Sequence, residues 1–281
     1  MKRDAYSWVY EVKGNESPLF FILGMCALEG EDIALRHADF LTKLAEKVGF
    51  KLLFKAAFDK ANRISIASGR GVGLDASCAI FEKIRTQFGV PVVTDVHETA
   101  QVPTIASVVD VLQIPAMLCR QTDLVVAAAK TGKPVFIKKG QFLAPEGMAQ
   151  LAKKAASVGN EHVWFGERGT SFGYNNLVVD FRSFPVMKTT GHPVIYDVTH
   201  SVQRPGALGS SSGGERHFVP ALAASAVVQG IAGIFMEVHE QPEVAHSDGP
   251  NSIRLSDLPA LVQYLVDLDK WAKERPLPKA V

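Results

Sequence analysis

Short apolar runs recur along the chain, and each leads into polar or ionisable residues and then into a helix-like segment. The runs are too short for typical helices and are rich in Val, Ile and Phe. That pattern is typical of strands buried on both faces of a parallel sheet. We therefore predict eight strands, at residues 20–26, 51–58, 91–97, 111–116, 134–140, 163–169, 193–200 and 233–239.

The segments between these strands, such as residues 31–49 and 73–89, are amphipathic. The second has apolar positions at helical spacing and ends in glycine, a frequent helix stop signal. Eight strand-plus-helix units with no intervening linker predict an α/β fold, a closed (β/α)₈ TIM barrel, as a single domain over residues 1–281. An open doubly wound sheet is the alternative fold.

Residues 1–18 precede the first strand as an N-terminal extension. Within it, residues 7–17 alternate between apolar and polar positions and then reach a Gly14-Asn15 turn signal. This pattern predicts a short hairpin that closes the N-terminal end, or bottom, of the barrel.

The overall composition excludes several classes of partner. The formal net charge is +1, so neither nucleic acid nor a membrane surface is indicated as a bulk partner. The three cysteines form no disulfide framework, and the N-terminus lacks the apolar core of a signal peptide, which together predict a cytoplasmic protein. The longest apolar run, residues 219–236, contains Gln229 and two glycines, and we predict a buried helix that leads into a buried strand.

Ionisable or polar residues stand at the end of every predicted strand. Any one of them could be structural, but eight of eight is difficult to explain as scaffold, because each unpaired buried ion costs several kcal/mol. The active site of a (β/α)₈ barrel lies at this end of the strands. Basic residues outnumber the acidic ones there, which predicts anionic substrates with either one phosphate and one carboxylate or two phosphates. These basic residues are Lys55, Lys60, Lys138 and Arg168, with Arg63 and Arg120 on loops.

A second set of strand-end residues suggests a metal site. Cys26, His200 and Glu237 end the first, seventh and eighth strands, and Asp248 follows the eighth. The first and eighth strands are neighbours in a closed barrel, so these side chains should converge. The set suits Fe²⁺, Zn²⁺ or Mn²⁺. The local spacing is a weak signal, and Cys26 as a small core residue is the alternative.

Two glycine-rich segments have less specific patterns. Residues 69–73 resemble a phosphate loop, although a turn leading into a helix is favoured. Residues 203–214 include a run of serines and glycines, which is compatible with a lid over the substrate or with a simple flexible connection.

Taken together, the motifs resemble those of the 3-deoxy-D-manno-octulosonate 8-phosphate synthases. They follow one another in order over nearly the whole chain, and the combination is far more specific than any single motif. The matching segments are residues 58–63, 93–98, 113–116, 120–123, 137–142, 167–174, 181–187, 197–200 and 247–250.

The resemblance implies a cytoplasmic (β/α)₈ transferase, usually a homotetramer, that condenses phosphoenolpyruvate with D-arabinose 5-phosphate and releases inorganic phosphate. The product, 3-deoxy-D-manno-octulosonate 8-phosphate, serves lipopolysaccharide biosynthesis or a plant cell-wall sugar. The metal-independent branch of the family has Asn where this chain has Cys26, and commonly Cys where it has Ser247. The chain thus resembles the metal-dependent branch, with a divalent ion (Fe, Zn or Mn) as cofactor.

The resemblance also implies roles for individual residues. Lys138 and Arg168 are expected to hold the phosphate of phosphoenolpyruvate, and Lys60 and Lys55 its carboxylate. Arg63, with Arg120 from a neighbouring subunit, is expected to hold the sugar phosphate, and Asn62 and Asp95 the sugar hydroxyls. Further substrate contacts are expected from Gln113, Ala116, Gln141 and Ser65. The expected metal ligands are Cys26, His200, Glu237 and Asp248, and the expected catalytic residues are Lys60, Asn62, Lys138, His200 and Asp248.

One position departs from the family pattern. The residue after Arg63 is usually Ser or Thr and contacts the sugar phosphate, but this chain has Ile64. Ser65 is the expected substitute.

Three other functions fit parts of the sequence. The aromatic-pathway synthases, which use erythrose 4-phosphate, carry Lys-Pro-Arg-Thr where this chain has Lys60-Ala-Asn-Arg63, so Asn62 favours arabinose 5-phosphate. Lys138 could instead form a Schiff base in a metal-free aldolase. A catalytically inactive binding barrel is the third alternative, although only position 64 departs from the family motifs.

Overall fold

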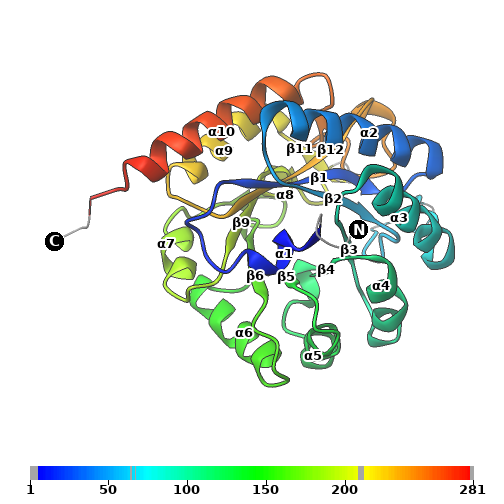
Figure 1. The fold of residues 1–281 in the computed structure, drawn as a ribbon, viewed down its shortest axis with the longest axis horizontal. Helices are drawn as coiled ribbons and strands as arrows, with labels where there is room; N and C mark the ends of the chain where they lie inside the picture. The colour runs from blue at the N-terminus through cyan, green and yellow to red at the C-terminus, as the bar shows by residue number, and fades with distance from the viewer. Residues whose placement is uncertain (1–5, 64, 67, 208–211, 279–281) are drawn as a thin grey trace.

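Eight parallel strands form a closed barrel in the computed structural model, which describes residues 6–63, 65–66, 68–207 and 212–278 (Figure 1). Closure comes from the pairing of the last barrel strand with the first, in which Phe20 is opposite Gly233. The predicted TIM barrel is therefore confirmed, and the open sheet is wrong. The barrel strands are β1 (Phe20–Ala27), β2 (Leu52–Ala57), β3 (Val92–Asp95), β4 (Val111–Ile114), β5 (Val135–Lys138), β6 (Val163–Glu167), β9 (Val194–Asp197) and β12 (Gly233–His239).

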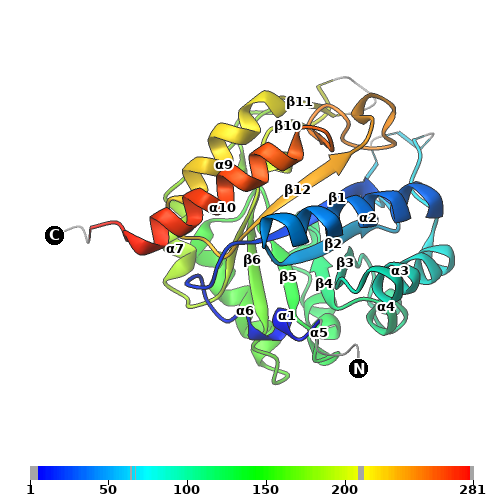
Figure 2. The same ribbon diagram turned by 45° about the horizontal axis from the view of Figure 1, so that its top comes forward.

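Helices cover the outside of the barrel (Figure 2). The two long helices after β1 and β2 end at Gly49 and Gly89, whose φ angles of +87° and +69° are left-handed, as the glycine stop signals predict. The helices are α2 (Glu31–Val48), α3 (Leu74–Phe88), α4 (Val102–Val108), α5 (Thr122–Lys130), α6 (Met148–Ala156), α7 (Ser183–Lys188), α8 (Val198–Ser201), α9 (Val219–Val227) and α10 (Leu258–Glu274).

The loops at the C-terminal ends of the barrel strands contain short strands and single 3₁₀ turns. Strand β13 (Ile253–Arg254) pairs with the end of β12. Two antiparallel ladders join β7 (Thr170–Ser171) to β8 (Leu177–Val178) and β10 (Gln203–Arg204) to β11 (Gly213–Gly214). Single 3₁₀ turns are η2 (Thr99–Gln101), η3 (Ala116–Leu118), η4 (Pro145–Gly147), η5 (Arg216–Phe218) and η6 (Pro242–Val244).

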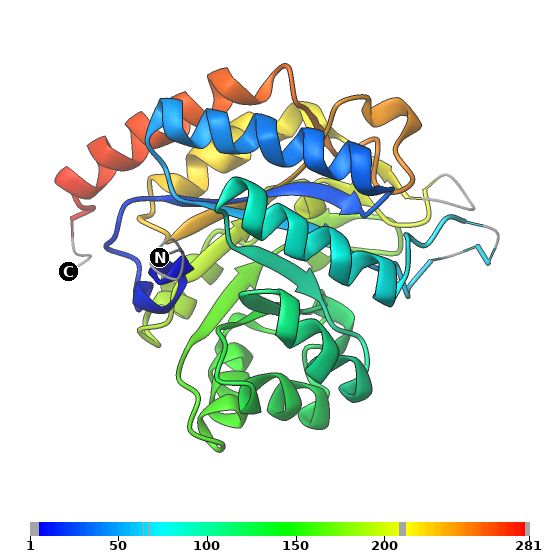
Figure 3. The same cartoon turned by 45° about the vertical axis from the view of Figure 1, so that its right-hand side comes forward.

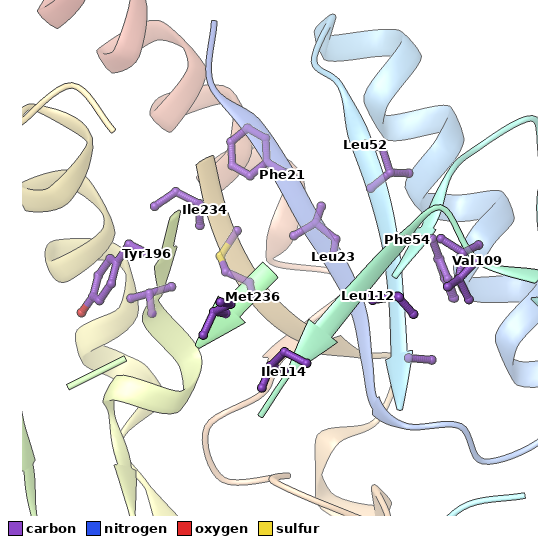
Figure 4. Packing of buried hydrophobic residues seen from close by; sticks show 14 of the residues in the cluster. Phe21, Leu23, Leu52, Phe54, Val109, Leu112, Ile114, Tyr196, Ile234 and Met236 are labelled. Atoms are coloured by element: carbon purple, nitrogen blue, oxygen red, sulfur yellow. The ribbon is translucent and has the colours of Figure 1, made fainter. Parts of the chain in front are cut away.

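Alternate residues of each barrel strand enter two different cores. In β1, Phe21 and Leu23 face the helices and pack with Met236 in the outer core (Figure 4). The intervening Ile22 belongs to the core inside the barrel, with Phe136 and other side chains. Burial on both faces explains why the strands are continuously apolar in the sequence.

The N-terminal segment closes the bottom of the barrel, but the predicted hairpin is wrong. Residues Trp8–Glu11 form a single helical turn, α1, and no strand is assigned among residues 6–19 (Figure 2). A helical turn places Trp8, Val9 and Val12 together in the inner core. The predicted turn residue Asn15 instead donates to His192 O and accepts from Val194 N, so its amide binds the start of β9.

The apolar run at residues 219–236 becomes helix α9 and part of strand β12, as predicted. Within the described residues, no helix combines the length and the hydropathy that a membrane crossing requires.

Candidate active site and metal centre

The loops that follow the barrel strands surround a cleft of about 1020 Å³, at the opposite end of the barrel from α1. In Figure 3, the loops after β2 and β12 lie at the right of the view, away from α1 at the left. Most of the predicted substrate-binding residues line the cleft: Lys55, Lys60, Asn62, Arg63, Asp95, Gln113, Ala116, Lys138, Gln141 and Arg168.

Two predicted substrate contacts do not line the cleft as the structure describes it. Ser65 is on the loop after β2, and Arg120 is exposed on the loop between η3 and α5. The backbone carbonyl of Arg120 accepts a hydrogen bond from Lys154. Ile64 lies outside the described residues.

The four predicted metal ligands do converge. One donor atom from each of Cys26, His200, Glu237 and Asp248 lies within 4.8 Å of the others. His200 Nε2 is 3.3 Å from Glu237 Oε1 and 3.5 Å from Asp248 Oδ2. The thiol of Cys26 donates to the same Asp248 oxygen at 3.2 Å. The donor set and its open side toward the cleft suit Fe²⁺, Zn²⁺ or Mn²⁺.

Local structure positions two of these residues, His200 and Cys26. Asp197 caps the one-turn helix α8 by accepting from the backbone N–H of His200, and its other oxygen lies 2.7 Å from His200 Nδ1. This leaves His200 Nε2 facing the cluster. In β1, Gly24 allows β2 to approach next to Cys26, since a Cβ atom at Gly24 would lie 1.8 Å from Lys55 O.

Electrostatics in the cluster favour a bound cation. Burial would lower the pKa of His200, but Asp197 and Glu237 outweigh it and raise that pKa above its ordinary value. Burial also opposes ionisation of Asp248, yet His200 holds the pKa of this carboxyl well below its usual range. The pKa of the Glu237 carboxyl is also lowered, so Asp248 and Glu237 both remain charged, and a divalent ion would replace the His200 proton beside them.

Two further observations fit a metal here. Burial and the nearby Asp248 and Glu237 charges raise the pKa of the Cys26 thiol well above its ordinary value, so the thiolate needs a cation to form. Glu237 is fully buried, and its Oε2 has no hydrogen-bond partner among the described residues. An unpaired buried carboxylate oxygen is costly, and a metal ion would satisfy it.

Basic side chains line the cleft beside this cluster. Lys55 and Lys60 lie 3.1 Å and 3.8 Å from Glu237 Oε1. Lys138 forms an ion pair with Asp197, and its Nζ lies 3.3 Å from the centre of the Phe235 ring. Burial lowers the pKa of Lys138 to about 8.

Arg168 carries the clearest sign of an anion site. Its side chain is only 5% exposed, and its Nη1 has no hydrogen-bond partner in the described part of the chain. Its Nη2 donates to Gln203 Oε1 at 3.1 Å and to His200 O at 3.4 Å. A buried guanidinium that lines a basic cleft and has an unused donor is suited to an anionic ligand.

The remaining predicted residues are placed on two sides of the cleft. The amide of Gln113 donates to Asp95, and its own oxygen has no partner in the described structure. Arg63 donates to Gly69 O and to Ser247 Oγ, both at 3.0 Å, and also to His246 O. The segment 69–73 thus contacts Arg63 and leads into α3, as the favoured interpretation predicts.

Comparison with known proteins agrees with the motifs. The sequence profile described as the DAHP synthetase I family matches residues 6–274. The chain belongs to this family. Similar proteins include three named 2-dehydro-3-deoxyphosphooctonate aldolase, another name for the octulosonate 8-phosphate synthases, so the predicted family resemblance is confirmed.

These relatives align along nearly their whole lengths. The protein from Magnetococcus marinus is 54% identical over 93% of this chain and 91% of its own length. The one from Rhodopseudomonas palustris is 55% identical over 94% of this chain and 92% of its own. The one from Trichlorobacter lovleyi is 57% identical over 91% of this chain and 94% of its own.

Sequence reasoning missed two residues of this family member's site. Gln203 bonds both Arg168 and Asp248, but the sequence indicated only that it begins a segment, residues 203–214, compatible with a lid or with a simple flexible connection. Asp197 entered the sequence analysis only as the first residue of the motif segment 197–200, although it contacts His200 and Lys138. Its position three residues before His200, as a potential helix cap, was the available signal.

Proposed function

We propose that this protein condenses phosphoenolpyruvate with D-arabinose 5-phosphate and water to give 3-deoxy-D-manno-octulosonate 8-phosphate and inorganic phosphate. The observation that carries the proposal is that Arg168 and Lys138 line the same cleft as His200 and Asp248, two of the four converging metal donors. Arg168 is buried, and its Nη1 has no hydrogen-bond partner among the described residues. The names of the aligned relatives support it.

We propose that the basic residues hold the two substrates side by side. Lys138 and Arg168 bind the phosphate of phosphoenolpyruvate, while Lys60 and Lys55 bind its carboxylate. Arg63 binds the sugar phosphate. Asn62 and Asp95 orient the sugar hydroxyls, with further contacts from Gln113, Ala116, Gln141 and Ser65. Holding both reactants in one cleft supplies the proximity contribution to the rate.

In the proposed reaction, the double-bond electrons of phosphoenolpyruvate form a bond from its methylene carbon to the aldehyde carbon of the sugar. The aldehyde oxygen takes up a proton and becomes a hydroxyl, and positive charge is left at C2. Water adds at C2, and the resulting hemiketal phosphate releases inorganic phosphate and leaves the ketone. Lys138 and Arg168 stabilise the charge on the departing phosphate. We propose that Asp248 and His200 share the proton that the water loses.

We propose Cys26, His200, Glu237 and Asp248 as the ligands of a divalent metal ion, Fe²⁺, Zn²⁺ or Mn²⁺. When bound, the ion would orient and polarise the aldehyde or the attacking water. In such sites the histidine ligand commonly hydrogen-bonds a carboxylate through its other ring nitrogen, and the 2.7 Å contact between His200 Nδ1 and Asp197 has this geometry.

We further propose a cytoplasmic, single-domain protein of lipopolysaccharide biosynthesis that assembles as a homotetramer. Several large apolar side chains are exposed on the loops after β4, β5 and β6, which supports burial against other subunits. These are Met117, Phe142, Phe172 and Tyr174. In such an assembly, the exposed Arg120 would reach the cleft of a neighbouring subunit.

The deciding experiment follows loss of phosphoenolpyruvate with arabinose 5-phosphate as co-substrate, before and after chelation. We expect consumption that needs the aldose phosphate, stops on chelation and returns with Mn²⁺, Fe²⁺ or Zn²⁺. Faster turnover with erythrose 4-phosphate would contradict the substrate assignment. Activity that survives complete metal removal would leave the condensation in place but contradict the metal site.

A further inference from the structure

Gln203 connects the two halves of the site. Its Nε2 donates to Asp248 Oδ1 at 2.7 Å, and its Oε1 accepts from Arg168 Nη2 at 3.1 Å. One amide thus contacts both the carboxylate proposed to bind the metal and the guanidinium proposed to bind phosphate. Neither contact involves the unpaired Nη1 of Arg168 or the Oδ2 of Asp248, which is the oxygen nearest His200 and Cys26.

Asp248 needs an external support of this kind. Its φ of 52° is left-handed, and it is the only residue other than glycine with a positive φ in the described chain. A side chain on such a backbone is strained and is held only by its surroundings. The hydrogen bond from Gln203 occupies Oδ1 and directs Oδ2 toward the donor cluster.

Gln203 itself is fixed by the backbone around it. It lies two residues after the end of α8, the helix that carries His200, and it pairs with Gly214 in the β10–β11 ladder. Its position relative to His200 is therefore set by local structure. The amide serves both partners because its NH₂ group donates and its oxygen accepts, whereas a carboxylate offers no donor to Asp248 and a hydrocarbon offers neither bond.

We propose that Gln203 is a positioning residue that presents one oxygen of Asp248 to the metal and aims Arg168 at the phosphate. The proposal rests on the proposed function, since it concerns the same metal and phosphate sites. Outer-shell partners of metal ligands typically change metal affinity by roughly 10- to 100-fold when removed. The loss of one charge-assisted bond to Arg168 should also weaken phosphate binding.

The test uses the metal-free full-length protein and the variant Gln203→Met, which has similar length but no hydrogen-bonding amide. Titration with Co²⁺, followed through the thiolate-to-cobalt absorption, gives the metal Kd without measuring activity. Calorimetry with inorganic phosphate gives the anion Kd. We expect the Co²⁺ Kd to rise roughly 10- to 100-fold in Gln203→Met, and the phosphate Kd to rise in parallel.

Gln263→Met is the matched control, because Gln263 is exposed on α10 and bonds only Asp267 among the described contacts. It should leave both constants unchanged. If Gln203→Met does not fold, Gln203→Asn carries the same prediction, because its amide is one methylene too short to reach both partners. Equal Co²⁺ affinity in the wild type and the variant would overturn this proposal alone. A wild type that gives no thiolate–cobalt absorption would overturn the metal site as well.

Discussion

At the scale of single residues, the site contains buried charged groups that are stabilised by opposite charges beside them. Cys26, Glu237 and Asp248 place three potential anions within one cluster, and the positive charge beside them comes from His200, Lys55 and Lys60. Lys138 and Arg168 are buried beside Asp197, yet their combined charge exceeds that of this one carboxylate. Among the described residues, Glu237 Oε2 and Arg168 Nη1 have no hydrogen-bond partner, and a ligand of opposite charge would complete the site at each of them.

Replacing the thiol of Cys26 tests the proposed metal site. Cys26→Ala should lose the bound metal and lower turnover by more than about 100-fold, because a ligand contributes at least as much as an outer-shell group. Metal content and phosphoenolpyruvate consumption are the measurements. Cys78→Ala is the matched control, since Cys78 is half-buried on α3, away from the cluster. Wild-type turnover in Cys26→Ala would mean that Cys26 is only a core residue.

The pH dependence of substrate binding tests Lys138. Burial lowers the pKa of this lysine from its ordinary 10.5 to about 8, so the ammonium form is lost as the pH rises through about 8. Since the ammonium attracts the phosphate, the KM for phosphoenolpyruvate should rise above that pH while kcat changes less. In Lys138→Arg, the guanidinium stays charged, and the rise should move to higher pH. A KM independent of pH between 7 and 9.5 would contradict this role.

The same variant separates condensation from Schiff-base chemistry. An imine requires the lysine amine, so Lys138→Arg would abolish an aldolase of that kind completely. We expect measurable condensation to remain, and borohydride with a keto substrate to leave the wild type unlabelled. Covalent trapping at Lys138 would favour the aldolase alternative.

At the scale of elements, the barrel separates stability from chemistry. Helix α1 fills the bottom of the barrel, where the Trp8 ring lies 5.4 Å from that of Phe20. The catalytic loops occupy the other end of the same strands. A change in α1 should therefore alter the free energy of unfolding and leave the cleft intact.

Trp8→Ala should lower the free energy of unfolding by about 3 kcal/mol, as expected for a large aromatic side chain removed from a core. Urea denaturation measures this loss, and kcat at low temperature should remain within about twofold of the wild type. Tyr10→Ala is the control, because Tyr10 is on the same helix but is 38% exposed. Equal stability losses in the two variants would show that α1 does not plug the barrel through Trp8.

At the scale of the whole molecule, the exposed Arg120 makes the proposed assembly testable. If Arg120 acts in a neighbouring cleft, Arg120→Ala should raise the KM for arabinose 5-phosphate by about tenfold or more. The subunit that carries Arg120→Ala would keep all four of its proposed metal ligands. Co-expression with Cys26→Ala should form mixed tetramers in which some sites have both a wild-type Cys26 and a neighbour's Arg120.

We expect such mixed tetramers to regain affinity for the aldose phosphate that neither variant shows alone. The measurement is the aldose-phosphate KM of doubly tagged, co-purified protein. Simple averaging of the two variants' activities would show that Arg120 does not cross between subunits.

The sequence by itself determined the barrel fold and which reactive and charged side chains stand at the ends of its strands. Continuous apolar runs specify strands buried on both faces, and the topology of such strands then brings their polar ends to one cleft. The donor set and most of the cleft residues could therefore be predicted. The confirmed family membership rests on motifs that are also local in sequence.

Only the tertiary structure decided how distant segments share contacts. The alternation of residues 7–17 predicted a hairpin, but the open end of the barrel offers more burial to a helical turn carrying Trp8 and Val9. Likewise, Asn15 binds β9 across 179 residues, and Gln203 reaches Asp248 across 45. A local pattern specifies which conformations a segment can adopt. The distant segments against which it packs select one of these conformations. Such contacts also place Gln203, a loop residue, where it bonds both Asp248 and Arg168.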